Sequence, residues 1–236
     1  MDGKDKREIR MILRRRSNII VKASDPFAGY NVVTELDSRE GVVLFDADNV
    51  DRWNDIRTDM YHLYNTTDTS ILPNYVDGRV YFQTPNERVG SLGHTQYNMD
   101  NLLYLYLVHR NPVEWISGCG HAQGGWGFQV NGSGFLKGLF GGWRTSTLDA
   151  ANATYPEVLG FYLNGANSKM ILGTQKWGFT TKLTGSEPAM QKYLKTVNGN
   201  EMPDNLDLYG YIAVEQSLSD SDIDNLVNSL KSKHNI

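Results

Sequence analysis

The sequence predicts an all-β fold, an antiparallel two-sheet sandwich with a short C-terminal helix and a basic N-terminal arm. Three observations support it. Short β-rich runs recur between turn signals from Arg39 onward, as in sandwiches and barrels. The last run alternates between two faces, and a capped amphipathic segment follows it. The chain has 236 residues, a length at which all-β sandwiches commonly form one domain.

Nine runs of strand length are predicted to form the sheets. They lie near 41–45, 79–83, 102–109, 126–130, 135–140, 158–163, 169–173, 176–182 and 207–215. Asn131-Gly132 and Asn164-Gly165 directly follow such runs, and Asn-Gly pairs favour hairpin turns with positive φ.

The final strand is expected to have two usable faces because its residues alternate. The first face takes Leu208, Gly210, Ile212 and Val214, and the second takes Tyr209, Tyr211 and Ala213. Ser219 then stands at a predicted N-cap, and Asp222 follows three positions later, the spacing of a capping box. The apolar residues Ile223, Leu226, Val227 and Leu230 recur at helical spacing. Lys231, Lys233 and His234 lie in the last turn, where positive charge opposes the helix dipole.

Two segments carry a family resemblance. The tail around LSDSDI, residues 218–223, and the run GVVLFDADNVDRWND, residues 41–55, resemble the concanavalin A-like lectin/glucanase superfamily with its laminin-G-like jelly roll. The resemblance implies a jelly-roll domain over residues 39–236, preceded by a basic arm over residues 1–38. It also implies lectin-like binding as a candidate activity.

Charge is distributed unevenly along the chain. Residues 1–22 have a net charge of +5, whereas the rest of the chain has −9. We expect the arm either to be a solvated tail or first strand, or to dock on an acidic partner surface. The arginines assigned to partner binding are Arg7, Arg10, Arg14, Arg15 and Arg16. No aromatic residues interleave them, which argues against nucleic acid as the partner.

The chain contains no apolar stretch of the roughly 20 residues that a membrane-spanning helix needs. Its N-terminus also lacks a secretory apolar region, because MILRRR interrupts it. We therefore expect cytoplasmic synthesis without a signal peptide. The single cysteine, Cys119, forms no disulfide framework and is expected to be a small core residue.

Residues 118–142 contain ten glycines in 25 positions. They lack the Gly-Lys-Ser/Thr step of a phosphate-binding loop and the βαβ setting of a dinucleotide site. Two interpretations stay open: tight hairpins with close sheet approach, or a shallow groove with an aromatic platform. The predicted ligand-binding residues are Trp115, Trp126, Trp143 and His121.

Catalytic patterns were not found in the sequence. Retaining glycosidases need two carboxylates about 5 Å apart, and no Glu-x-Asp-x-x-Glu run supplies them. Jelly-roll polysaccharide lyases use clustered His, Tyr and Arg side chains, and Tyr104, Tyr106 and His109 could supply such a surface. The alternative is that one side of the predicted strand near 102–109 packs into the core. No nucleophile elbow or zinc spacing is present. No cofactor is predicted. A calcium site stays a possibility at Asp46, Asp48 and Asn49, whose oxygens suit a hard cation. The alternative is a turn stabilised by hydrogen bonds from these side chains to the backbone.

Thirteen tyrosines, five tryptophans and twenty asparagines suit both sugar stacking and protein interfaces. The first hypothesis is a non-enzymatic, lectin-like structural or adhesion protein of a larger assembly. A bacteriophage virion component fits the missing export signal, the missing catalytic pattern and the basic arm. The alternative is a carbohydrate-binding module for glycan recognition. A polysaccharide lyase or hydrolase is the third.

Overall fold

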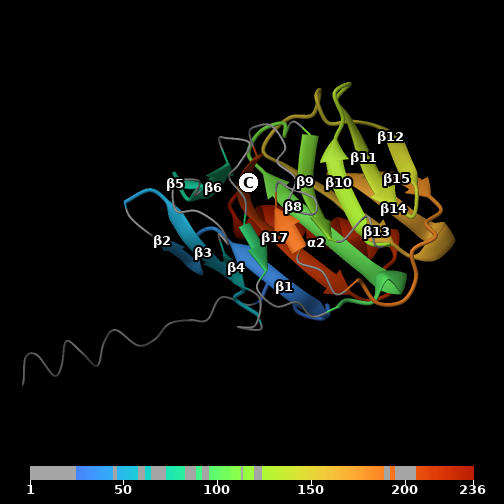
Figure 1. The fold of residues 1–236 in the computed structure, drawn as a ribbon, viewed down its shortest axis with the longest axis horizontal. Coiled ribbons are helices and arrows are strands. Elements are labelled where there is room, and N and C mark those ends of the chain that lie inside the picture. Colours follow the sequence, from blue (N-terminus) through green and yellow to red (C-terminus); the bar gives the residue numbers. More distant parts are fainter. Residues whose placement is uncertain are drawn as a thin grey trace, which may run out of the picture.

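The computed structural model describes residues 25–44, 47–57, 62–64, 73–82, 89–91, 96–112, 114–119, 124–188, 192–194 and 206–236. These residues form two stacked antiparallel sheets and a C-terminal helix, α2 (Asp220–Lys233) (Figure 1). The predicted all-β sandwich with one short C-terminal helix is confirmed. No helix in the described ranges is long and apolar enough to span a bilayer.

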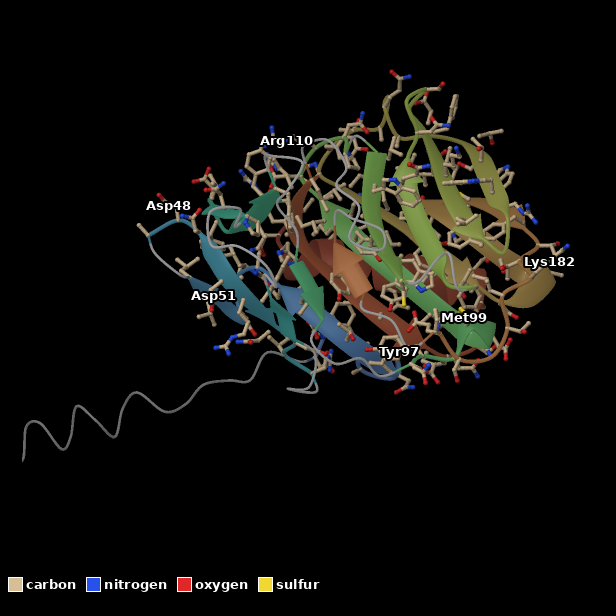
Figure 2. The ribbon with its side chains drawn as sticks, in the orientation of Figure 1. Asp48, Asp51, Tyr97, Met99, Arg110 and Lys182 are labelled. Carbon is tan, nitrogen blue, oxygen red and sulfur yellow. The ribbon has the colours of Figure 1, made fainter. Side chains whose placement is uncertain are left out.

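The first sheet, sheet A, contains eight strands. Its order is β15 (Gln175–Phe179), β14 (Ser168–Leu172), β13 (Glu157–Leu163), β8 (Leu102–Val108), β17 (Leu206–Glu215), β6 (Arg79–Phe82) and β5 (Asn74–Val76), and β1 (Val32–Asp37) also pairs with β17. Short 3-10 turns precede two of these strands, η2 (Met99–Asn101) before β8 and η4 (Gly165–Asn167) before β14. Figure 2 shows Met99 near the start of β8 and Arg110 just beyond its other end.

The second sheet, sheet B, contains nine strands. Its order is β12 (Trp143–Asp149), β11 (Phe135–Phe140), β10 (Trp126–Val130), β9 (Glu114–Cys119), β16 (Lys192–Leu194), β7 (Val89–Ser91), β4 (His62–Tyr64), β3 (Val50–Asn54) and β2 (Val42–Leu44). Figure 1 shows β9 to β12 side by side, in green to yellow.

Aromatic rings fill the space between the sheets. The ring of Tyr104 lies 4.8 Å from that of Trp126 and 6.1 Å from that of Tyr106, measured between centroids. Phe161 is within 5.3 Å of both Trp126 and Phe128. Tilted and offset contacts at these separations are favourable beyond the burial of the rings themselves. The same core holds Cys119, which is fully buried as expected.

Strand β8 is buried along its whole length because sheet A is covered on both faces. Tyr104 and Tyr106 point toward sheet B, whereas Leu103 and Leu105 lie in a second cluster with α2. That explains why LLYLYLV is almost continuously apolar instead of alternating with polar residues.

A bulge in β17 corrects the predicted face assignment. The register shifts between Leu208 and Gly210, so Leu208 joins Tyr211 in the core between the sheets, and Tyr209 packs with Ile212 on the helix side. Gly210 is required there, because a Cβ atom would lie 2.3 Å from the carbonyl oxygen of Leu36. A one-residue bulge reverses which face each following side chain occupies.

Helix α2 begins as predicted. The Ser219 hydroxyl accepts from the Asp222 backbone N–H, and the Asp222 carboxylate accepts from the Ser219 backbone N–H. All four predicted apolar residues of the helix are buried: Ile223, Leu226, Val227 and Leu230. Capping and burial together seat the helix on sheet A.

Ion pairs fix the other end of α2 to β1. Lys233 pairs with Glu35 and lies 2.9 Å from the Asp37 carboxylate. Burial alone would raise the pKa of Asp37, but hydrogen bonds from Arg39 and Lys233 hold it well below its usual range. Burial lowers the pKa of His234, 3.8 Å from Asp37, to about 4. His234 is therefore neutral at pH 7.

Strand β1 lies in a segment that the prediction assigned to the N-terminal arm. Its residues pair with β17 from Val32 to Asp37, and Phe27 before it is buried against the helix-side cluster. Sheet A thus includes residues 32–37, which the prediction placed in the arm of residues 1–38. Residues 1–24, with all five arginines assigned to partner binding, lie outside the described residues.

Both predicted Asn-Gly turns connect hairpin strands, with one change of detail. Between β10 and β11 the positive φ falls on Gly134, at 86°, instead of on Gly132. The Asn131 side chain accepts hydrogen bonds of 3.0 Å from the N–H groups of Ser133 and Phe135, which makes a longer turn. Gly165 takes a positive φ of 52° as expected.

Candidate functional site

The outer face of sheet B carries two adjacent rows of residues across β9 to β12. The first row is Gly118, Gly127, Leu139 and Trp143, and the second is Trp115, Gln129, Lys137 and Thr145. The burial pattern of β12 confirms that these positions point outward, because Trp143 and Thr145 are exposed while Ser146 and Leu148 face the core. We call Trp115, Gln129, Lys137, Trp143 and Thr145 the tryptophan patch.

Two tryptophans meet in this patch. The ring centroids of Trp115 and Trp143 are 5.8 Å apart, with the rings tilted by 46°. Trp115 is only 7% exposed, whereas Trp143 is 49% exposed. The inner ring therefore supports the outer one, which presents a large apolar surface to solvent.

Glycine makes this packing feasible. A Cβ atom on Gly127 would lie 2.5 Å from Cζ3 of Trp115, so the indole lies directly against the strand backbone. Gly138 serves the opposite face, where a Cβ atom would lie 2.2 Å from the Phe140 ring in the core. The glycine-rich sequence thus gives both close packing in the core and an open aromatic surface outside.

Polar groups surround the exposed ring. The ammonium of Lys137 lies 4.1 Å from the centroid of Trp143, a cation–π distance. Thr145 is exposed beside it, and Gln129 lies in the same row. Gln129 is only 8% exposed, so the Lys137 ammonium over the ring and the Thr145 hydroxyl beside it are the polar groups that a ligand contacting Trp143 can reach.

Arg144 anchors the edge strand that carries Trp143. Its Nε and Nη2 atoms both donate to the carbonyl of Thr180 at 3.3 Å, and its Nη1 donates to the carbonyl of Trp143 at 3.0 Å. Since Thr180 follows β15 of sheet A, these bonds tie the two sheets together at their open edge. Trp143 is positioned before any ligand arrives.

Trp126 corrects the predicted set of binding residues. It is 1% exposed, its ring packs between Tyr104 and Phe161, and its Nε1–H donates to Glu187 at 2.7 Å. Glu187 is itself fully buried, so the indole satisfies a core carboxylate. No face of the ring is left for a ligand. His121, the remaining predicted member, lies outside the described residues.

The tyrosines of the lyase hypothesis do not form a catalytic face with His109. Tyr104 and Tyr106 are buried between the sheets, where burial raises the pKa of each hydroxyl well above its usual value. His109 instead hydrogen-bonds to Tyr209 at 3.1 Å, and burial and Arg79 lower its pKa. These three side chains therefore share no surface.

The described residues contain no cluster of three or more His, Cys, Asp or Glu side chains with metal-ligand geometry. The turn considered for calcium is paired with β5, where the Tyr75 N–H donates to the Asp48 carbonyl at 2.6 Å and Asn49 bridges Asn74. Asp46 lies outside the described residues. Figure 2 shows Asp48 at the opposite side of the molecule from Lys182, which lies beside the β11–β12 turn.

Gln129, Lys137 and Thr145 were not predicted from the sequence as site residues. Strand β12 was not predicted, because WRTSTLD places Ser146 at a core position. The Ser146 hydroxyl donates to the Leu136 carbonyl at 3.0 Å and accepts from the Leu148 N–H at 3.1 Å, so it is satisfied where an apolar residue is expected. The alternation of Trp143, Thr145 and Thr147 with the residues between them is the sequence pattern that could have predicted this strand and its exposed face.

No protein-family model and no curated protein sequence matches this chain. Solved structures do share its fold. The binding domain of Paraclostridial Mosquitocidal Protein 1 aligns with a TM-score of 0.57 and 14% identity over 85% of this chain and 52% of that one. A botulinum neurotoxin type C structure aligns with a TM-score of 0.59 and 15% identity over 85% of this chain and 51% of that one. Its description states that cell entry by the toxin depends on interaction with two ganglioside molecules.

Trypanosoma rangeli sialidase in complex with sialic acid aligns with a TM-score of 0.56 and 10% identity, over 86% of this chain and 33% of the sialidase. At identities this low, the structural alignments establish a common β-sandwich fold and no more. The chain spans about half the length of the two toxin structures, at 52% and 51%.

Proposed function

We propose that this chain is a glycan-binding module and that the tryptophan patch is its binding surface. The observation that carries the proposal is the exposed ring of Trp143, supported by Trp115 and flanked by Lys137. Sugar rings present apolar C–H faces to an aromatic ring and hydroxyls to polar neighbours, which are the two kinds of contact available here.

Two fold neighbours support this choice over a purely structural role. One is described by its interaction with gangliosides, and another is in complex with sialic acid. These ligands belong to those proteins. They show that sugar recognition occurs in proteins containing this sandwich, while the residues of the patch supply the specific argument for this chain.

A glycan array tests the proposal. Wild-type protein should bind a defined subset of oligosaccharides, and Trp143→Ala should lose at least about tenfold in affinity, or about 1.4 kcal/mol. Trp143→Phe is the matched control, because it keeps an aromatic face on the same strand. If no array glycan binds the wild type, or if Trp143→Ala binds the same set equally well, glycan recognition by the patch is wrong.

We also propose that the module acts by binding without catalysis. The tyrosines that could serve a lyase are buried away from the patch, and no carboxylate belongs to the patch. A panel of polysaccharides incubated with the protein should release no reducing ends. Release above a heat-inactivated control would assign an enzymatic role instead.

The role as a structural subunit of a larger assembly, such as a bacteriophage virion, depends on the basic residues 1–22. These residues lie outside the described part of the chain, so that role and the arm's protein partners stay predictions. Deletion of residues 1–22 should abolish assembly if the arm is the anchor. A truncated protein that still incorporates would contradict it.

A further inference from the structure

A recess lies at the far end of β12 from Trp143. It has a volume of about 470 Å³ and lies where the end of β12 meets β13 and the β14–β15 turn. Its polar lining consists of Thr147, Asp149, Asn152, Thr154, Glu157 and Gln175. A recess of this volume falls in the range of small-molecule sites.

Both carboxylates in the recess are held in place. Asp149 accepts from the Asn152 backbone N–H at 3.2 Å and from its side-chain amide at 2.7 Å. Glu157 accepts through Oε1 from Lys231 of α2 at 2.6 Å and from the Val158 N–H at 2.8 Å. The walls of the recess are therefore built before a ligand binds, which lowers the entropy cost of binding.

Other polar groups in the recess are available to a ligand. Among the described residues, the hydroxyls of Thr147 and Thr154 and the side-chain amide of Gln175 form no hydrogen bond. All three side chains are exposed. Hydroxyls and amides both donate and accept, so together they match the hydroxyl pattern of a sugar ring.

Charge restricts the ligand further. Two lining groups are carboxylates, and no Lys or Arg lines the recess. Lys231, the cation that pairs with Glu157, approaches from α2. Asp149 therefore leaves the recess with net negative charge, and an anionic ligand would meet like charge there, at an energetic cost that solvent partly screens.

We infer that the recess is a second sugar-binding subsite, selective for an uncharged sugar residue. The inference rests on the proposed glycan-binding function and adds to it a ligand class and a location. Strand β12 joins the two subsites, since Trp143 and Thr145 belong to the patch and Thr147 and Asp149 line the recess. The six residue steps from Trp143 to Asp149 span about 20 Å of extended strand, so one sugar ring cannot contact Trp143 and Asp149 together.

Nuclear magnetic resonance of the full chain with methyl glycosides tests the inference. The probes are uncharged methyl hexosides and the anionic methyl glucuronide, each at up to about 20 mM, because a single sugar ring binds in the millimolar range. At least one uncharged glycoside should shift the side-chain amide signals of Asn152 and Gln175 saturably, and the glucuronide should not. An equal response to the glucuronide would overturn the selectivity.

The Trp143 indole signal separates this inference from the proposed function. If glycans move the Trp143 signal but no uncharged glycoside moves those of Asn152 and Gln175, the second subsite is wrong and the patch stands. If the Trp143 signal never moves while those amides respond, the patch is wrong and the recess binds on its own.

Two matched variants locate the binding. Thr147→Val removes one hydroxyl from the recess while keeping a β-branched side chain suited to a strand, and it should weaken the Asn152 response at least threefold. Thr184→Val makes the same change at an exposed position outside both the recess and the tryptophan patch, and should leave the response unchanged. Equal responses in wild type and Thr147→Val, with Gln175→Ala also unchanged, would overturn the inference.

Discussion

The two sheets of this sandwich differ in what covers them. Sheet A is packed by sheet B on one face and by α2 on the other, so its strand β8 is buried at every position. No described helix packs on the outer face of sheet B, and its edge strand β12 alternates exposed with buried residues. The comparison predicts that sheet A and its helix contribute most to stability, and it agrees with the proposal that ligand contacts lie on sheet B.

Two tryptophans of sheet B, Trp126 on β10 and Trp143 on β12, give the sharpest form of this contrast. Trp126→Ala should cost about 3–5 kcal/mol in the free energy of unfolding, because it opens a cavity in the aromatic core and leaves Glu187 without its indole donor. Trp143→Ala should cost less than about 1 kcal/mol, as is usual for exposed positions. Urea unfolding of both variants measures the difference.

Comparable losses from the two variants would break the contrast, because Trp143 would then be a packing residue. The wild-type urea slope serves as the control, since a changed slope would signal a changed denatured state instead of a changed native contact.

Acid should loosen the attachment of α2 to sheet A. His234 has a folded pKa of about 4 against an ordinary value near 6.5, so the unfolded state binds protons more readily between these values. Stability therefore falls as pH drops from about 6.5 to 4, by about 3 kcal/mol. Below about pH 4 the lowered pKa of Asp37 adds a further loss in the same direction.

The pH effect is measured as the urea midpoint across pH 4 to 8. His109 also titrates with a lowered pKa, so the comparison of wild type with His234→Asn isolates the contribution of His234. The variant should show a shallower dependence on pH. An unchanged slope would mean that the helix end is not held through a neutral His234.

A smaller effect separates the two kinds of glycine in residues 118–142. Gly127→Ala should cost about 1 kcal/mol, because its methyl group meets the Trp115 ring, and it should also weaken glycan binding by displacing that ring. Gly132→Ala is the matched control, since nothing lies within 4 Å of its Cβ position. Equal glycan affinity in both variants would show that the packing of the Trp115 ring on Gly127 does not affect glycan binding.

Much of the fold was predictable because it follows from local patterns. Each of the nine predicted runs corresponds to an observed strand whose ends differ by a few residues at most. Ser219 and Asp222 correctly predicted the start of α2. The β17 bulge was not predictable, since it depends on how close the Leu36 backbone approaches Gly210. That approach is a tertiary contact with no counterpart in the local sequence.

The candidate site was predictable only in part, because exposure depends on register. Trp126 alternates with Phe128 and Val130, a pattern that indicates the core face. Trp143 alternates with Thr145 and Thr147, a pattern that indicates the solvent face. The composition alone treats the tryptophans as equivalent, and only the pairing of β9 to β12 brings Trp115 to Trp143.

The most direct test of the account is calorimetric titration of the best array glycan into wild type, Trp143→Ala and Trp143→Phe. We predict that Trp143→Ala binds at least about tenfold more weakly, that Trp143→Phe stays within about threefold of wild type, and that all three unfold at similar urea concentrations. Equal affinity of the wild type and Trp143→Ala would contradict the claim that the tryptophan patch on the outer face of sheet B is the binding surface.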